Sequence, residues 1–452
     1  MSRIRSLIVR SSATAARFVT ESPDLRAVAS ECDVDRVVMG TIMRAGDQLR
    51  VTAQLVEAPG GTLLSSHTAQ SGLNDLFRLQ DDIARRVVAA LALPLRGDDR
   101  SPTPDVAPEA SAYGLYLRAN ELARRYDELP HARELYQRCI DLDPRFAPAW
   151  ARLGRCHWVI GKYLGDAADS AARAEEALRR ALELNPSLSV AHMFYAQLES
   201  DTGHAPQALT RLLAAAVRYG NDPELFAGIV HAARYCGLNE QSVAAHEEAR
   251  RLDPNVPTSL AQTLLMMGEF DRALSVPRTP GAGTGDDSIR VIALGLAGLR
   301  DEARRALIDL RKTARIPAFD VRSDYLMAWL ERRSGGMRDA LPGLAELKIM
   351  QDPEAIFQDG WLLCDVGDHA RGLDRLREAV AAGYTVAPTL ATSPVFDALR
   401  DNPAFRTMLS DAEAGRRRAL DAFREAGGEQ LLREGRAGPP VATPSIASPG
   451  TS

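Results

Sequence analysis

Residues 147–186 decide the fold of this chain, and they read APAWARLGRCHWVIGKYLGDAADSAARAEEALRRALELNP. Gly154 and Ala174 are small residues placed where two antiparallel helices would cross closely. Large apolar residues that would fill the seam beside them are Trp150, Leu153 and Leu178. Pro186 ends the second helical segment, because proline lacks an N–H and clashes with the preceding turn. The stretch therefore predicts a hairpin of two packed helices.

The order of these residues resembles the tetratricopeptide repeat, a helix-turn-helix unit. His157 stands where the motif usually has Tyr, and residues 166–172 look inserted. Dipeptides that would end successive units recur at a spacing near the length of one repeat: Asp143-Pro144, Asn185-Pro186, Asp222-Pro223 and Asp253-Pro254. The resemblance therefore implies an all-α superhelix (α-solenoid) of tetratricopeptide type, so that the chain is mostly α overall.

The repeat pattern divides the rest of the chain. Repeats are expected over residues 111–276, and degenerate helical repeats with a capping helix over 288–426. A Gly- and Pro-rich loop over 277–287 would separate them, and residues 427–452 should form a disordered tail. We expect about eight helix pairs, well above the three that a stable repeat stack needs.

Residues 1–96 have the pattern of a small α+β domain. A short strand is expected near residues 4–9, a helix over 25–32, and a covering helix over 73–93. The turn triplet Ala45-Gly46-Asp47 and the alternation of apolar residues around it predict a β-hairpin. The expected strands are 36–44, 48–57 and 62–69. A polar, Pro-rich linker follows over 97–110.

Two strings in this part, VMGTIMRAGDQLRVTAQL (38–55) and DLFRLQDDIA (75–84), resemble the TolB-like amino-terminal domain. The resemblance covers about residues 3–93, an ordinary length for one domain. In bacterial signalling proteins such a domain commonly precedes tetratricopeptide repeats and often follows a serine/threonine kinase, an adenylate cyclase or a winged-helix domain. The family's first strand and helix would lie before Met1, so we expect either a start further upstream or an incomplete domain with an exposed sheet edge.

Composition argues against several classes of protein. The net charge of -5 over 452 residues gives no sign of a nucleic-acid or membrane partner. No run approaches the roughly 18 apolar residues of a membrane span, so the expected location is the cytoplasm. The basic residues are almost all Arg, which indicates a GC-rich bacterial genome. The five scattered cysteines suggest buried thiols in a reducing compartment, with a metal or redox role as the less favoured alternative.

No catalytic, cofactor or metal site is predicted. The eight histidines never fall in ligand spacing such as H-E-x-x-H, and neither a G-x-S-x-G elbow nor kinase signatures occur. The run Gly281-Ala-Gly283-Thr-Gly285 suggests a phosphate loop, but Pro280 precedes it and Asp286-Asp287 would repel phosphate. A loop between repeats is the preferred interpretation.

The remaining candidate is a binding surface. In tetratricopeptide stacks the first helix of each pair lines a concave groove, and repeat spacing places eight residues there: Arg124, Arg125, Arg155, Trp158, Gln197, His231, Arg234 and Tyr235. Arginines among aromatic rings suit an acidic protein or peptide. The alternative is that these are ordinary exposed arginines in an Arg-rich chain. Leu117 and Glu121 stand where carboxylate-clamp repeats carry Lys and Asn, which disfavours chaperone tails as partners.

The leading hypothesis is therefore a non-enzymatic protein-interaction module that binds a partner in the groove of its repeats. The rival is the regulatory remainder of an adenylate cyclase, a serine/threonine kinase or a transcriptional regulator, whose catalytic or DNA-binding domain would lie upstream of Met1. A DNA-binding role within this chain is disfavoured, since no basic recognition helix is evident.

Overall fold

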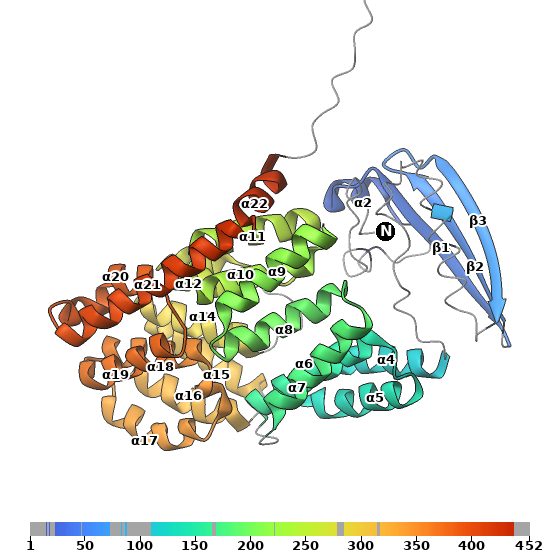
Figure 1. Ribbon diagram of the computed structural model, residues 1–452. Coiled ribbons are helices and arrows are strands. Elements are labelled where there is room, and N and C mark those ends of the chain that lie inside the picture. Colours follow the sequence, from blue (N-terminus) through green and yellow to red (C-terminus); the bar gives the residue numbers. More distant parts are fainter. Residues whose placement is uncertain are drawn as a thin grey trace, which may run out of the picture.

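The computed structural model describes residues 23–46, 48–72, 110–164, 169–220, 222–277, 284–313 and 317–437, with isolated positions near residues 15–18 and 83–87. A small three-stranded sheet near the amino terminus is followed by a long array of helices (Figure 1). This arrangement confirms the predicted fold class. The predicted strand at 4–9, nearly all of the helix at 73–93 and the linker up to 109 lie outside the described residues.

The sheet is an antiparallel meander in the order β1-β2-β3. Its strands are β1 (Arg36–Ala45), β2 (Gln48–Glu57) and β3 (Leu63–Gly72), and the helix α2 (Leu25–Cys32) precedes them. The predicted hairpin forms, because Gly46 takes the left-handed conformation (φ +62°) that such a turn needs. The central strand β2 buries Ala53 and Leu55, whereas Ile42 on the edge strand β1 is exposed.

From residue 110 onward, short turns join antiparallel helices into pairs. The first five pairs are α4 (Ala110–Leu122) with α5 (Leu129–Leu142), α6 (Ala147–Tyr163) with α7 (Ser170–Leu184), α8 (Ser189–Asp201) with α9 (Ala205–Tyr219), α10 (Pro223–Tyr235) with α11 (Asn239–Leu252), and α12 (Leu260–Met266) with α13 (Phe270–Ser275). A 3₁₀ turn, η4 (Tyr126–Glu128), joins the first two helices.

Three more pairs follow: α14 (Thr284–Leu296) with α15 (Arg300–Thr313), α16 (Pro317–Leu330) with α17 (Ser334–Ala345), and α18 (Pro353–Asp365) with α19 (His369–Ala381). The described part of the chain thus contains the expected eight pairs. The other elements are η5 (Lys348–Gln351) before α18, and then α20 (Ala387–Thr392), η6 (Pro394–Leu399), α21 (Pro403–Glu425) and α22 (Gly428–Ala437).

Two predicted boundaries are wrong. The loop at 277–287 is shorter than expected, because α14 already begins at Thr284. The tail predicted from residue 427 begins instead with the amphipathic helix α22, which buries Leu432. The predicted capping helix at 404–425 is confirmed as α21.

Helix crossings depend on the small residues that the sequence places there. A Cβ at Gly154 would lie 2.7 Å from Leu178 Cγ and 3.1 Å from the Ala174 carbonyl oxygen. The same holds in the last pair, where a Cβ at Gly360 would lie 2.9 Å from Leu376 Cγ. Because Gly154 and Gly360 have no side chain, the backbone of α6 can contact α7 directly, and the backbone of α18 can contact α19.

One of the four dipeptide terminators has a different role. Asp143, Asn185 and Asp253 do end helices. Asp222 instead begins α10, since its carboxylate accepts a hydrogen bond from the Glu224 N–H and Pro223 occupies the first turn. Asp-Pro suits a helix start because the aspartate caps free N–H groups and proline needs none.

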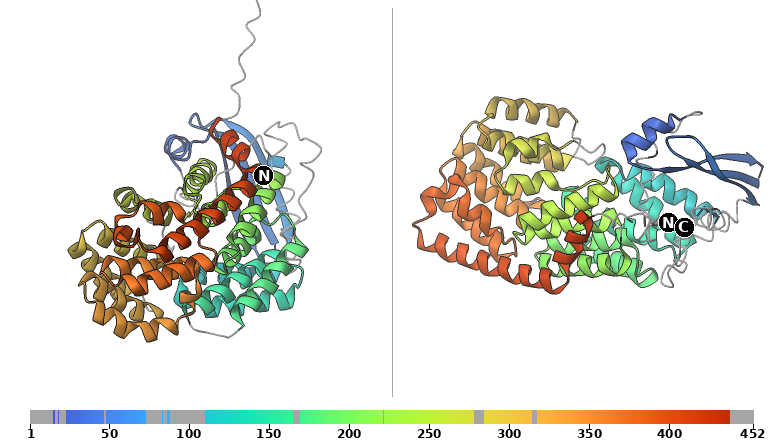
Figure 2. Two further views of the ribbon diagram at one scale, coloured as in Figure 1. Left: turned by 60° about the vertical axis from the view of Figure 1, so that its left-hand side comes forward. Right: turned by 90° about the horizontal axis from the view of Figure 1, so that it is seen from above.

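The array curls so that its last helices return to the middle pairs (Figures 1 and 2). Thr385 N–H donates to the Tyr235 carbonyl (3.0 Å), and Thr389 Oγ1 donates to the Met266 carbonyl (2.6 Å). Helix α21 packs on α9 and α19. Among the helices described, none is long and apolar enough to span a membrane.

Candidate functional site: an ionic cluster inside the array

Six of the eight predicted groove residues lie on the first helices of their pairs. Helix α6 carries Arg155 and Trp158, α8 carries Gln197, and α10 carries His231, Arg234 and Tyr235. Arg124 and Arg125 do not, because α4 ends at Leu122 and both residues lie in the following turn. Their side chains are 72% and 64% exposed and pair with Glu121 and Asp127. Repeat spacing therefore misplaced these two arginines.

Asp201, at the end of α8, is the centre of a buried ionic cluster. Its Oδ2 accepts hydrogen bonds from Lys162 Nζ (2.7 Å) and Trp158 Nε1 (2.9 Å). Its Oδ1 lies 3.0 Å from the Tyr235 hydroxyl and 3.2 Å from His231 Nε2. Three predicted groove residues therefore converge on one carboxylate of the same chain.

A second carboxylate reaches this point from the far end of the array. Lys162 Nζ lies 2.6 Å from Asp352 Oδ2, and the Tyr235 hydroxyl lies 2.9 Å from Asp352 Oδ1. Because a phenol carries one proton, Tyr235 can donate to Asp201 or to Asp352 but not to both at once. Lys162 thus bridges α6 to α8 and to the start of α18.

Arg234 forms the other half of the cluster. Its Nε and Nη2 donate to the two oxygens of Glu354 at 2.7 and 3.1 Å, a bidentate pair. Nη1 donates to Ser259 Oγ (2.6 Å), and the Tyr384 hydroxyl donates to Glu354 Oε1 (2.9 Å). Only 1% of Arg234 is exposed, so the partners of its guanidinium all belong to this chain.

The sequence Asp352-Pro353-Glu354 explains how α18 presents two carboxylates. Asp352 caps the helix by accepting the Glu354 N–H (2.9 Å), and Pro353 occupies the first turn. Glu354 lies where the helix dipole favours negative charge. The residues that begin α18 therefore also supply the two carboxylates that contact α6 and α10.

The cluster holds three carboxylates and two permanent cations: Asp201, Asp352 and Glu354 against Lys162 and Arg234. Burial raises the pKa of Asp352 to about 6, with Lys162 opposing this effect and the Asp201 charge adding to it. Burial acts the same way on Asp201, but Lys162 and His231 hold its pKa well below the usual range. Asp352 is therefore the acid in this cluster that takes up a proton first.

The contribution of two buried acids, Glu224 and Asp352, to stability should rise as the pH falls from 8 to 5. Burial and the neighbouring Asp222 raise the pKa of Glu224 to about 7, and that of Asp352 is about 6. Unfolded carboxyl groups titrate near pH 4, so both groups favour the folded state most below that pH. Their contribution is lost as the pH rises through about 6 and about 7, and each is worth on the order of 3 kcal/mol.

Urea unfolding at pH 5, 6, 7 and 8 checks this expectation. Asp352→Asn and Glu224→Gln should each flatten the rise, and the double variant should flatten it most. Asn can still cap α18, so the change isolates the charge. If the unfolding free energy depended on pH in both single variants as it does in the wild type, the raised pKa values of Asp352 and Glu224 would be contradicted.

Two predicted residues outside the cluster, Arg155 and Gln197, lie on α6 and α8, the helices that also carry Trp158 and Asp201. The Arg155 guanidinium stands 5.8 Å from the centre of the Phe194 ring on α8, a cation–π distance. Arg155, Trp158 and Gln197 are each half-buried. A partner-binding role for the eight residues stays a prediction, and the cluster shows that Arg234 and Tyr235 contact the chain itself.

Sequence reasoning missed five residues of the cluster: Lys162, Asp201, Asp352, Glu354 and Tyr384. One signal was available, since Lys162 is among only three lysines in a chain with 55 basic residues. Lys162 and Asp352 are 190 positions apart, and no local pattern pairs such residues.

The charged groups of the cluster pair with one another and thereby hold α6, α8, α10 and α18 together. Within the described ranges, no group of His, Cys, Asp and Glu could hold a metal ion. All five cysteines are buried and none forms a disulfide.

Comparison with known proteins adds two findings, although no protein-family profile matches the chain. The "Putative adenylate cyclase 3" of Rhizobium meliloti (strain 1021) is 30% identical over 158 residues, which make up 34% of this chain and 27% of that protein. The chain therefore matches only about a quarter of that relative's length.

Among solved structures, the P58(IPK) TPR domain aligns with 68% of this chain and 99% of its own, at 11% identity and a TM-score of 0.19. That score is too low to support an argument, so the fold rests on the eight packed pairs. The helical part of the chain is a tetratricopeptide-like repeat array. The TolB-like resemblance of residues 3–93 stays a prediction.

Proposed function

We propose that this chain is a non-enzymatic module whose tetratricopeptide-like array binds a segment of a protein partner. One observation carries the proposal: the inner helices α6, α8 and α10 already hold the acidic start of a helix from the same chain. Lys162 and Arg234 each meet a carboxylate there, and aromatic side chains complete the contacts. This chemistry suits an acidic partner segment.

The partner would bind beside the cluster and not within it. Residues 353–364 of α18 are all buried, so removing them would expose part of the main core. The half-buried residues Arg155, Trp158 and Gln197 form the neighbouring accessible surface on α6 and α8. On this proposal Arg234 and Tyr235 position α10 and need not touch the partner.

Site-specific photo-crosslinking tests the location. A benzoyl-phenylalanine at residue 155 or 197 should crosslink a protein in lysate of the native host. The same group at residue 179, an exposed arginine on the second helix α7, is the matched control. A discrete adduct at 155 or 197 and none at 179 would support the proposal. Equal labelling at all three positions would count against it.

A second candidate rests on the match to the putative adenylate cyclase. The chain would then regulate a cyclase without being one. Purified chain supplied with ATP and Mg²⁺ or Mn²⁺ should form no cyclic AMP, and its formation would overturn the non-enzymatic proposal. A change in the rate of the purified Rhizobium protein on adding the chain would favour a regulatory role.

A further inference from the structure

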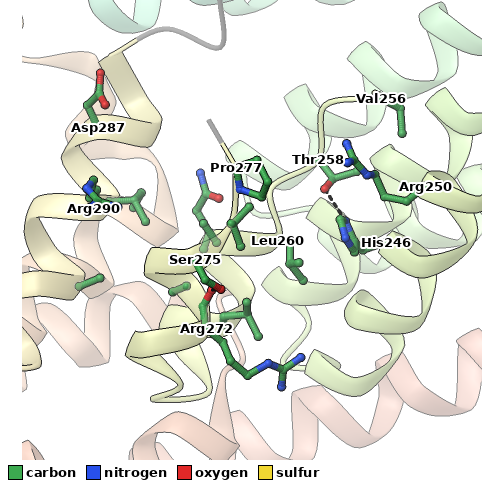
Figure 3. Close-up of a pocket in the computed structure, with 17 residues that line it drawn as sticks. His246, Arg250, Val256, Thr258, Leu260, Arg272, Ser275, Pro277, Asp287 and Arg290 are labelled. Carbon is green, nitrogen blue, oxygen red and sulfur yellow. Dashed lines mark hydrogen bonds between the residues drawn. The ribbon is translucent and has the colours of Figure 1, made fainter. Parts of the chain in front are cut away.

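A pocket of about 310 Å³ lies between α11, the α12–α13 pair and α14 (Figure 3). This volume is at the lower end of the range for small-molecule sites. None of the residues in the ionic cluster lines it. The pocket is therefore a separate feature of the array.

The pocket exists because one pair is too short to fill its place. Helices α12 and α13 have 7 and 6 residues, whereas the helices of the other pairs have between 12 and 17. Pro254 and Pro257 delay the start of α12, and Pro277 follows the end of α13. Among the residues that the structure describes, none fills the space beside α11 and α14.

The walls combine an apolar interior with basic side chains. The apolar lining includes Val256, Leu260, Leu264, Ile289 and Ala293. Among the described lining residues are three arginines, Arg250, Arg272 and Arg290, and a single acid, Asp287. Figure 3 shows Arg250 and Arg290 on opposite sides. With one acid against three arginines, the lining has an excess of positive charge.

The three arginines differ in how they are held. Arg272 pairs with Glu269, and Arg290 donates to the Leu274 carbonyl (3.1 Å). Within the described part of the chain, neither a hydrogen bond nor an ion pair holds the Arg250 guanidinium. Arg250 is thus the best placed to receive an anion.

A neutral polar pair stands beside Arg250. His246 Nδ1 and Thr258 Oγ1 lie 2.7 Å apart. Burial, followed by the Arg250 charge, lowers the pKa of His246, so the imidazole is neutral near pH 7. Thr258 adds a hydroxyl beside the arginine at the same end of the pocket (Figure 3).

We propose that this pocket binds a small amphipathic carboxylate, with its apolar body against Leu260 and Leu264 and its carboxylate at Arg250 and Thr258. A guanidinium matches a carboxylate with two parallel hydrogen bonds. The apolar body would cover wall that is now open to solvent. The same chemistry is offered by a free acid of medium chain length and by the carboxyl end of a peptide with an apolar last residue.

Saturation-transfer NMR and calorimetry on the full chain test the proposal with octanoate. Octanoate should bind, while octylamine and octanol, which share its chain but not its charge, should bind at least about tenfold more weakly. Arg250→Gln should weaken octanoate binding about tenfold or more. Arg305→Gln, which removes an exposed arginine on α15, is the matched control and should leave binding unchanged.

Leu260→Glu provides a second test, because it places a carboxylate in the apolar wall and should abolish binding. Circular dichroism confirms that each variant remains folded. A peptide ending in Gly-Leu with a free carboxylate, compared with its amide, distinguishes the two sources: tighter binding than octanoate points to a protein carboxyl terminus, and weaker binding to a free acid. Octanoate binding that is absent, or equal in Arg250→Gln and wild type, would overturn the proposal.

Discussion

Arg234→Met is expected to lower the free energy of unfolding by about 3–5 kcal/mol. The substitution keeps the length and apolar stem of the side chain but removes the partner of Glu354. That carboxylate would stay buried, with the Tyr384 hydroxyl still donating to it but no cation beside it. An uncompensated buried charge is far more costly than the net value of the pair that it came from.

Two further variants make this expectation specific. Arg179→Met removes an exposed i,i+4 pair with Glu183 on α7 and should cost about 0.5 kcal/mol or less. Adding Glu354→Gln to Arg234→Met should restore part of the lost stability, because the unpaired charge disappears. Urea unfolding at pH 7.5 measures all three. A loss below about 1 kcal/mol for Arg234→Met would mean that solvent reaches this arginine.

The same contrast shows what the sequence could and could not reveal. Helical periodicity placed His231, Arg234 and Tyr235 on the first helix of a pair, and the structure agrees. Periodicity fixes which face of a helix a residue occupies, but not what later covers that face. An exposed groove arginine would tolerate replacement without loss of stability, so the measurement separates the two situations.

The missing information is long-range. The helix pairs follow from contacts within about one repeat, and local patterns predict those well. The curl that brings Asp352 to Lys162 depends on small rotations accumulated over several pairs. A local signal did exist at the helix start, since Asp-Pro-Glu occurs at 222–224 and at 352–354 and caps a helix both times. The sequence could therefore predict that α18 begins there, but not which helices its carboxylates would meet.

The prediction for Arg124 and Arg125, which lie in the turn after α4, failed for a related reason. Spacing between repeats varies by a few residues, and α4 ends before Arg124. A shift of this size moves a side chain from the groove to a turn. Positions near helix ends are thus the least secure part of any groove mapped by spacing.

Gly154→Val is expected to destabilise the protein by about 3 kcal/mol, the second large effect. A Cβ at this position would lie 2.7 Å from Leu178 Cγ and 3.1 Å from the Ala174 carbonyl oxygen. Leu178 is fully buried and cannot swing away, and the carbonyl belongs to the backbone of α7. The two helices would have to separate, which opens the seam that the first pairs share.

Gly114→Val is the matched control, since Gly114 also lies within a helix but a Cβ added there would meet no atom within 4 Å. Glycine and valine both have low helix propensity, so this change should stay within about 0.5 kcal/mol of wild type. Thermal and urea unfolding of both variants measure the difference. If Gly154→Val were equally harmless, close contact between α6 and α7 would not be what this glycine provides. Small residues at the crossings would then no longer explain why the helices pair.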